Sequence, residues 1–390
     1  MLNTAFSPWP SFTQEEADAV SQVLLSNKVN YWTGQECREF EKEFAAFAGT
    51  EYAIALANGT VALDVALQAM GIGAGDEVVV TPRTFLASVS SVVNIGAVPV
   101  FAEVDRDSQN ITAETIQAVL TPRTRAVICV HLAGMPCDME PIMALADQYG
   151  FYVIEDCAQA HGARYQGKPV GSIGHVGAWS FCQDKIMTTG GEGGMVTTND
   201  RELWSRMWSF KDHGKSWEAV YEREHAPGFR WLHESFGTNW RMTEMQAAIG
   251  RIQLRRMPAW LAARTANAER IWNTAAALPG LRVPRAPQRM VHAAYKCYVF
   301  VEPEQLKPGW DRDRILNEIN QRGVPCYSGS CSEVYLEKAF DGTPYRPAER
   351  LPVARQLGET SLMFLVHPTL TDAEIALTCE VLQEVMALAA

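Results

Sequence analysis

The chain has 390 residues, of which 47% are hydrophobic, and its formal net charge at pH 7 is −11. This length predicts two unequal domains, each with its own core. The acidic balance disfavours nucleic-acid binding, which needs clustered basic side chains to neutralise phosphates. Residues 1–10 have neither the basic start nor the apolar core of a signal peptide, and no window approaches the roughly 20 apolar residues that span a bilayer. We therefore expect a cytoplasmic protein that binds neither nucleic acid nor membrane.

The nine cysteines occur mostly inside apolar stretches such as 127–130, which is typical of reduced core thiols. Cys326 and Cys331 lie close together, but no spacing in the chain resembles that of a zinc site. We therefore expect no metal.

The first predicted helix begins after Thr13, a candidate N-cap, because Glu16 follows three residues later and apolar residues then recur at helical spacing. The polar stretch 30–34 predicts a loop with an exposed aromatic residue. A second helix follows, with a stripe of phenylalanines at Phe40, Phe44 and Phe47.

From residue 50 onward, short apolar runs alternate with helical patterns. The apolar runs are 78–80, 98–101, 126–130, 151–154 and 194–197, and the intervening helices are expected near 60–70, 85–95, 112–120 and 138–149. Runs that are apolar throughout indicate a largely parallel sheet that is covered on both faces. This part of the chain therefore predicts a doubly wound large domain.

A long helical pattern follows Thr243, is interrupted at Pro258 and reaches about Leu278, where Pro279 and Gly280 end it. The remaining residues, with a strand candidate at 296–301 and helices near 311–322 and 371–389, predict a smaller domain. We expect an N-terminal helix and loop in 1–30, a large domain in 31–254 and a small domain in 255–390.

Lys185 and Asp156 are the most informative residues. Lys185 lies between an apolar run, 178–181, and a glycine-rich turn, 188–194, and Asp156 follows the apolar run 151–154. Ligand sites of open α/β sheets lie at the carboxyl ends of strands. An amine and a carboxylate at two adjacent strand ends suit pyridoxal phosphate (PLP), because the amine can form a Schiff base and the carboxylate keeps the pyridine nitrogen protonated.

Either motif alone is weak, since most lysines are solvated and glycine-rich stretches are often only turns. Their order and spacing together resemble the DegT/DnrJ/EryC1/StrS family of PLP-dependent nucleotide-sugar aminotransferases, and the resemblance spans nearly the whole chain. It implies fold type I, an α/β fold whose large domain holds a mostly parallel seven-stranded sheet, with a smaller α+β C-terminal domain. It also implies that Lys185 and Asp156 are catalytic.

The resemblance implies further cofactor contacts. Gly59 and Thr60 would bind the phosphate at a helix start, whereas Asn58 departs from the serine usual in the family and is also a plausible N-cap. The other implied ligands are Phe85 and Ala158 on the two ring faces, Gln159 near the phenolic oxygen, and Ser180 at the phosphate. Asn239 would reach the phosphate held by the other subunit, which implies a homodimer with shared active sites.

Candidates for substrate contact are weaker. Stretches that approach the sugar or nucleotide in relatives contain Trp32, His161, His213, Lys215 and Tyr327, and candidates for the diphosphate are Lys215, Arg230 and Arg241. A tryptophan-rich stretch either lines a nucleotide pocket or packs in the core; its members are Trp204, Trp208, Trp217, Trp231 and Trp240.

The implied reaction converts a 3-keto or 4-keto group of a nucleotide-linked sugar, a 6-deoxy hexose, to an amine with glutamate as donor. One alternative is a PLP-dependent sugar dehydratase, but relatives of that class replace the lysine with histidine, and Lys185 is present here. The other alternative is a regulatory relative, which the acidic balance and the lack of a separate DNA-binding module disfavour.

Overall fold

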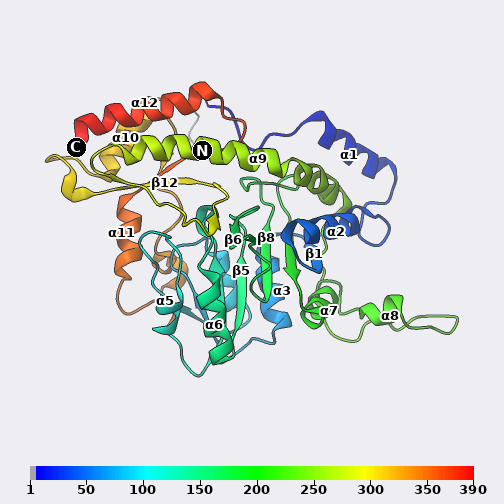
Figure 1. Cartoon of the computed structure of the whole chain (residues 1–390). Helices are drawn as coiled ribbons and strands as arrows, with labels where there is room; N and C mark the ends of the chain where they lie inside the picture. Colours follow the sequence, from blue (N-terminus) through cyan, green and yellow to red (C-terminus); the bar gives the residue numbers. More distant parts are fainter. Residues whose placement is uncertain (1–5) are drawn as a thin grey trace.

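A computed structural model describes residues 6–390 (Figure 1). Residues 1–5 belong to the expected segment 1–30 and to the stretch checked for a signal peptide, and they lie outside the described residues. Helix α9 (Glu244–Ala276) crosses the top of the molecule in Figure 1, with α12 (Asp372–Ala389) alongside it and the large sheet beneath. Among residues 6–390, no helix combines the length and the apolar character needed to cross a membrane.

The large sheet has seven strands in the order β1-β9-β8-β5-β4-β2-β3. Its strands are β1 (Tyr52–Leu56), β2 (Glu77–Val80), β3 (Val98–Phe101), β4 (Thr124–Val130), β5 (Tyr152–Asp156), β8 (Val176–Ser180) and β9 (Gly194–Thr198). Only β9 runs antiparallel to its neighbours, and β2, β8 and β9 are buried along their whole length. The mostly parallel sheet predicted from the apolar runs is confirmed.

The helices around this sheet also follow the predicted pattern. They are α1 (Gln14–Leu25), α2 (Glu36–Ala48), α3 (Gly59–Ala69), α4 (Ala87–Asn94), α5 (Ala113–Gln117), α6 (Met139–Tyr149), α7 (Arg201–Phe210) and α8 (Trp217–Tyr221), with a 3-10 turn η1 (Leu132–Gly134). At the start of α1, the Thr13 N–H donates to the Glu16 carboxylate at 2.9 Å. Phe40 and Phe44 on α2 are fully buried, so the phenylalanine stripe faces the core.

The C-terminal part forms a second, antiparallel sheet in the order β10-β12-β14-β13. Its strands are β10 (Leu281–Arg282), β12 (Cys297–Val301), β13 (Cys326–Tyr327) and β14 (Ser361–Phe364), and its helices are α10 (Arg312–Gln321), α11 (Pro352–Thr360), α12, η2 (Pro303–Gln305), η3 (Val334–Leu336) and η4 (Lys338–Phe340). A third, short sheet joins β11 (Met290–Val291), β6 (Arg164–Tyr165) and β7 (Lys168–Pro169).

The predicted interruption at Pro258 is wrong, because α9 continues through it. A proline inside a helix costs about 3 kcal/mol through its missing hydrogen bond and its clash with the preceding turn. Here α9 packs against α1 and α2 and against α12, and it buries Met257 before the proline and Trp272 after it. These contacts outweigh the local cost. Residue 254, the expected end of the large domain, lies inside this helix.

The loop at 30–34 also differs from its prediction, because its aromatic residues are not exposed. Tyr31 is buried, and Trp32 is half-buried with its ring edge-on to Trp208 at 6.2 Å. The Lys215 ammonium lies 4.0 Å from the centre of the Trp32 ring. Cation–π and edge contacts of this kind favour an aromatic side chain that lies against the body of the protein.

Candidate active site

A cavity of about 560 Å³ opens where β4, β5 and β8 end. It is lined by eight of the predicted cofactor residues, Gly59, Thr60, Phe85, Asp156, Ala158, Gln159, Ser180 and Lys185. A second cavity of similar size, about 570 Å³, lies between α1, α2 and α9, but its walls hold ion-paired side chains such as Arg251 and none of the predicted site residues. The strand-end cavity is therefore the candidate active site.

Asp156 is buried at the end of β5, on the wall of this cavity. The Ser88 hydroxyl donates to its Oδ2 at 2.8 Å, and the Ala158 N–H donates to its Oδ1 at 3.1 Å. Burial raises the pKa of Asp156 above its usual range, although these two donors and the Lys185 ammonium oppose the shift. A buried carboxylate in this state is stabilised by a further positive group, such as a protonated ring nitrogen.

Lys185 lies in the loop that follows β8, and its side chain is only 16% exposed. The Trp9 indole donates to the Lys185 carbonyl at 2.9 Å, and the Trp9 ring is covered by the Arg264 guanidinium, 5.0 Å from its centre. A segment near residue 9 and a buried residue of α9 thereby fix the backbone of the loop that carries the lysine.

The first turn of α3 lies directly against the end of β8. Gly59 is required there, because a Cβ at this position would lie 2.5 Å from the Ser180 Cβ. The Asn58 side chain accepts from the Val61 N–H at 3.0 Å, so Asn58 is the N-cap. The first N–H groups of a helix lack partners within it and favour an anion, which suits a phosphate beside Gly59, Thr60 and Ser180.

Gln159 and Phe85 complete the walls. The Gln159 Oε1 accepts from the Ala133 N–H at 2.8 Å, which leaves the amide nitrogen as the group available to a ligand. Phe85 is 72% exposed, so its ring has little packing within this chain. An aromatic ring at a cavity wall suits stacking on a planar ligand.

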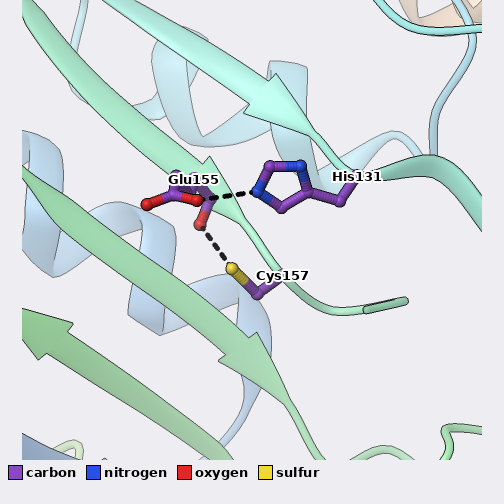
Figure 2. A group of neighbouring side chains, drawn as sticks. All are labelled: His131, Glu155 and Cys157. Carbon is purple, nitrogen blue, oxygen red and sulfur yellow. Dashed lines mark hydrogen bonds and ion pairs between the residues drawn. The ribbon is translucent and has the colours of Figure 1, made fainter. Parts of the chain in front are cut away.

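Behind Asp156, three buried residues form a hydrogen-bonded group, His131, Glu155 and Cys157 (Figure 2). The His131 Nδ1 accepts from the Cys137 N–H at 3.0 Å, so its Nε2 carries the proton that is donated to Glu155 at 2.9 Å. Glu155 also accepts from the N–H groups of Gly171, Ile173 and Gly174. These donors occupy both carboxylate oxygens, so the group braces the backbone beside Asp156.

Asn239 and His161 do not line the cavity. Asn239 is exposed on the segment before α9. His161 is fully buried, with its ring centre 5.3 Å from that of Trp179 and 5.7 Å from that of Phe181, and burial lowers its pKa to about 3. The interpretation of His161 as a substrate contact is therefore wrong, because the aromatic residues enclose it.

The remaining candidates also lie outside the cavity. Lys215 and Arg241 both contact Asp212, at 3.3 and 2.7 Å, so their charges are already paired. His213 and Arg230 are exposed, and Tyr327 is half-buried on β13. Three of the tryptophans pack edge-on to one another in the core and its margin, namely Trp204, Trp208 and Trp217, whereas Trp231 is exposed.

Sequence reasoning missed three residues of the site, Ser88, Asp184 and Tyr295. Ser88 binds Asp156 from the first turn of α4, and its position three residues after Phe85 was the available signal. Asp184 precedes Lys185 in the chain and contacts its amine. Tyr295 donates to Asp184 from a segment more than a hundred residues away, and no sequence pattern marks it.

Comparison with known proteins agrees with this geometry. The family model described as the DegT/DnrJ/EryC1/StrS aminotransferase family matches residues 10–383. The chain is 37% identical to GDP-perosamine synthase of Caulobacter vibrioides over 382 residues, 97% of each protein. It is 35% identical to UDP-N-acetyl-3-dehydro-alpha-D-glucosamine 3-aminotransferase of Acidithiobacillus ferrooxidans over 387 residues, 99% of this chain and 96% of that one.

The solved structure of an aminotransferase from Psychrobacter cryohalolentis is 69% identical, with a TM-score of 0.97 over 98% of this chain and 99% of that one. The cavity fits the cofactor of the family, because it places a buried carboxylate, an amine and a free helix start around a space of sufficient size. On these findings, the chain belongs to the DegT/DnrJ/EryC1/StrS aminotransferase family and is a PLP-dependent aminotransferase.

Proposed function

We propose that the enzyme converts a 3-keto or 4-keto group of a nucleotide-activated 6-deoxy hexose to an amine, with glutamate as the amino donor. The observation that carries this proposal is the meeting of Lys185, Asp156 and the α3 start in one cavity. The relatives named above act on GDP-linked and UDP-linked sugars, which supports a nucleotide sugar as substrate. The product would enter polysaccharide, glycan or antibiotic synthesis, and the enzyme would work in the cytoplasm.

In this proposal, Lys185 has two roles. Its amine holds the cofactor covalently, and after release it moves a proton between the substrate Cα and the cofactor C4′ as general base and acid. Asp156 keeps the ring nitrogen protonated, and Ser88 and Ala158 hold the Asp156 carboxylate in place. When bound, PLP supplies an electron sink for the bond that breaks at Cα.

The other lining residues bind and orient the cofactor. Gly59, Thr60 and Ser180 would hold the phosphate, since a helix start favours an anion. Phe85 would stack on one ring face with Ala158 against the other, and the Gln159 amide would donate to the phenolic oxygen. Each contact fixes the ring relative to Lys185, which aligns the proton transfer.

We further propose a homodimer in which Asn239 of each protomer completes the phosphate site of the other. Asn239 is exposed and outside its own cavity, and the segment between α8 and α9 projects from the body of the chain (Figure 1). That segment carries Phe229, Trp231 and Phe236 at 77%, 81% and 100% exposure. Large aromatic residues exposed together favour an interface.

The dimer can be tested by mixing two inactive variants, Lys185→Ala and an Asn239 substitution severe enough to inactivate alone. Random reassociation is expected to restore about a quarter of the wild-type activity, because half of the dimers are mixed and each mixed dimer has one intact site. A monomer that stays fully active on dilution would contradict the proposal.

The substrate can be tested by incubation with glutamate and a panel of UDP-, dTDP- and GDP-linked keto sugars, with mass detection of the amino sugar. Amination of one nucleotide sugar well above 2-oxo acids is the expected result. Equal amination of simple 2-oxo acids would replace the sugar enzyme with a general amino-acid aminotransferase. A panel of donors run with the best sugar tests glutamate in the same way.

A further inference from the structure

Asp184 faces the amine of Lys185 from the same loop. The Asp184 Oδ1 lies 3.5 Å from the Lys185 Nζ, and both residues line the active-site cavity. The lysine side chain is mostly buried, whereas the aspartate side chain is more than half exposed toward the cavity. The amine therefore has an anionic neighbour that is independent of Asp156.

The second oxygen of Asp184 is held by Tyr295. The Tyr295 hydroxyl donates to the Asp184 Oδ2, and the Lys185 Nζ lies 5.5 Å from the centre of the tyrosine ring. Tyr295 is buried in the segment before β12, and its N–H donates to the Ala133 carbonyl at 3.0 Å. A residue next to the small sheet thus fixes a carboxylate of the large-sheet loop, with one oxygen on the tyrosine and the other on the amine.

The electrostatics agree with this arrangement. Burial alone would raise the pKa of Asp184, but Lys185 and the Tyr295 hydroxyl, with Lys296 nearby, hold that pKa below its usual range. Burial and the adjacent carboxylate raise the pKa of Tyr295, so its hydroxyl keeps the proton that it donates. Asp184 is an anion at neutral pH.

Other charged or titratable groups surround the pair and bear on any titration of the amine. They are Asp156 at the end of β5, His161 behind the loop, Arg264 on α9, Lys296 beside Tyr295, and Cys182 and Glu192 on the same loop. Glu192 is the useful comparison, since it also lines the cavity but forms no ion pair with Lys185 among the described residues.

We propose that Asp184 is a positioning residue for the Lys185 amine and that Tyr295 fixes Asp184 for this task. The inference rests on the proposed role of Lys185 as the covalent anchor. On release from the cofactor, Lys185 takes the proton of the incoming ammonium, while the bond to the cofactor passes from the lysine nitrogen to the incoming nitrogen. The resulting Lys185 ammonium is held beside Asp184, from which it can return its proton.

The same contact favours the protonated form of the lysine–cofactor bond, so the pH midpoint of the yellow absorbance reports it without a measurement of activity. Asp184→Asn removes the charge and keeps the size, and the midpoint is expected to fall by about one pH unit. Glu192→Gln removes a charge from the same cavity and is the matched control, with an expected shift of less than about 0.3 unit.

An unchanged midpoint in Asp184→Asn, or an equal shift in Glu192→Gln, would overturn the inference. Tyr295→Phe keeps the carboxylate charge and is expected to shift the midpoint less than Asp184→Asn; an equal shift would assign the effect to the tyrosine and also overturn it. Asp184→Ser repeats the test if the asparagine variant does not fold.

Borohydride fixation and peptide mapping of each variant keep the two proposals separate. A label on Lys185 with an unchanged midpoint would remove only the role of Asp184. A label on another residue would instead remove the proposed role of Lys185.

Discussion

Glu155 and Asp156 are neighbours at the end of β5, and the two faces of the sheet treat their charges in opposite ways. On the face of Glu155, four donors occupy the carboxylate; although burial would raise its pKa, His131 and the N–H groups of Gly171 and Gly174 hold it below its usual range. On the face of Asp156, two donors leave the pKa raised by burial. A saturated charge braces the fold, and an undersaturated charge in a cavity is available to a ligand.

The largest expected effect comes from the cavity face. Lys185→Ala removes the covalent anchor and the proton-transfer group together, and transamination of the best keto sugar is expected to fall by several orders of magnitude. Thermal unfolding should change little, because the lysine makes few contacts besides Asp184. In wild type, borohydride should fix the cofactor on Lys185; a label elsewhere would contradict the assignment.

Asp156→Asn tests the undersaturated charge directly. Loss of a charge-assisted hydrogen bond to the ring nitrogen is worth about 1.5–3 kcal/mol, so kcat should fall by at least about tenfold to a hundredfold. The cofactor-free variant should be as stable as wild type or more stable at pH 7. The reason is that the raised pKa makes wild type lose stability as pH rises from the unfolded to the folded pKa of Asp156. Urea unfolding between pH 4 and 7 measures this, and a less stable variant at pH 7 would contradict the comparison.

Glu155→Gln should have the opposite consequence. An amide cannot accept all four hydrogen bonds, so the free energy of unfolding should fall by about 1–3 kcal/mol at pH 7. The folded pKa of Glu155 is lowered, so its stabilisation is present above the unfolded pKa and is lost as pH falls through the folded pKa. The difference between variant and wild type should therefore shrink in acid. Equal urea midpoints at pH 7 would show that Glu155 is not a brace.

Phe85→Leu should give the smallest effect. The ring is mostly exposed, so the stability of the cofactor-free chain should not change measurably. Loss of stacking on the cofactor is worth about 0.5–1.5 kcal/mol, which corresponds to roughly a twofold to tenfold weaker PLP affinity. Fluorescence titration of the cofactor-free protein with PLP measures this, and an unchanged affinity would remove Phe85 from the cofactor site.

The sequence predicted the parts of the fold and site that depend on local patterns. Apolar runs between helical patterns were enough for β2 to β5, and strand ends followed by Asp156 and Lys185 were enough to place the cavity. The missed features depend on contacts between distant segments. Pro258 stays helical because of helices packed on both sides, His161 is enclosed by strand aromatics, and Tyr295 meets Asp184 only in the folded chain.

The anchoring of the lysine loop also has a consequence for synthesis of the chain on the ribosome. The loop is tied to Trp9, which is made early, and to Tyr295, which is made only after the whole of α9. The seven strands of the large sheet are complete by Thr198, so the sheet can form first. The lysine loop receives its last tie about a hundred residues later, which delays a competent cofactor site until translation is nearly three-quarters complete.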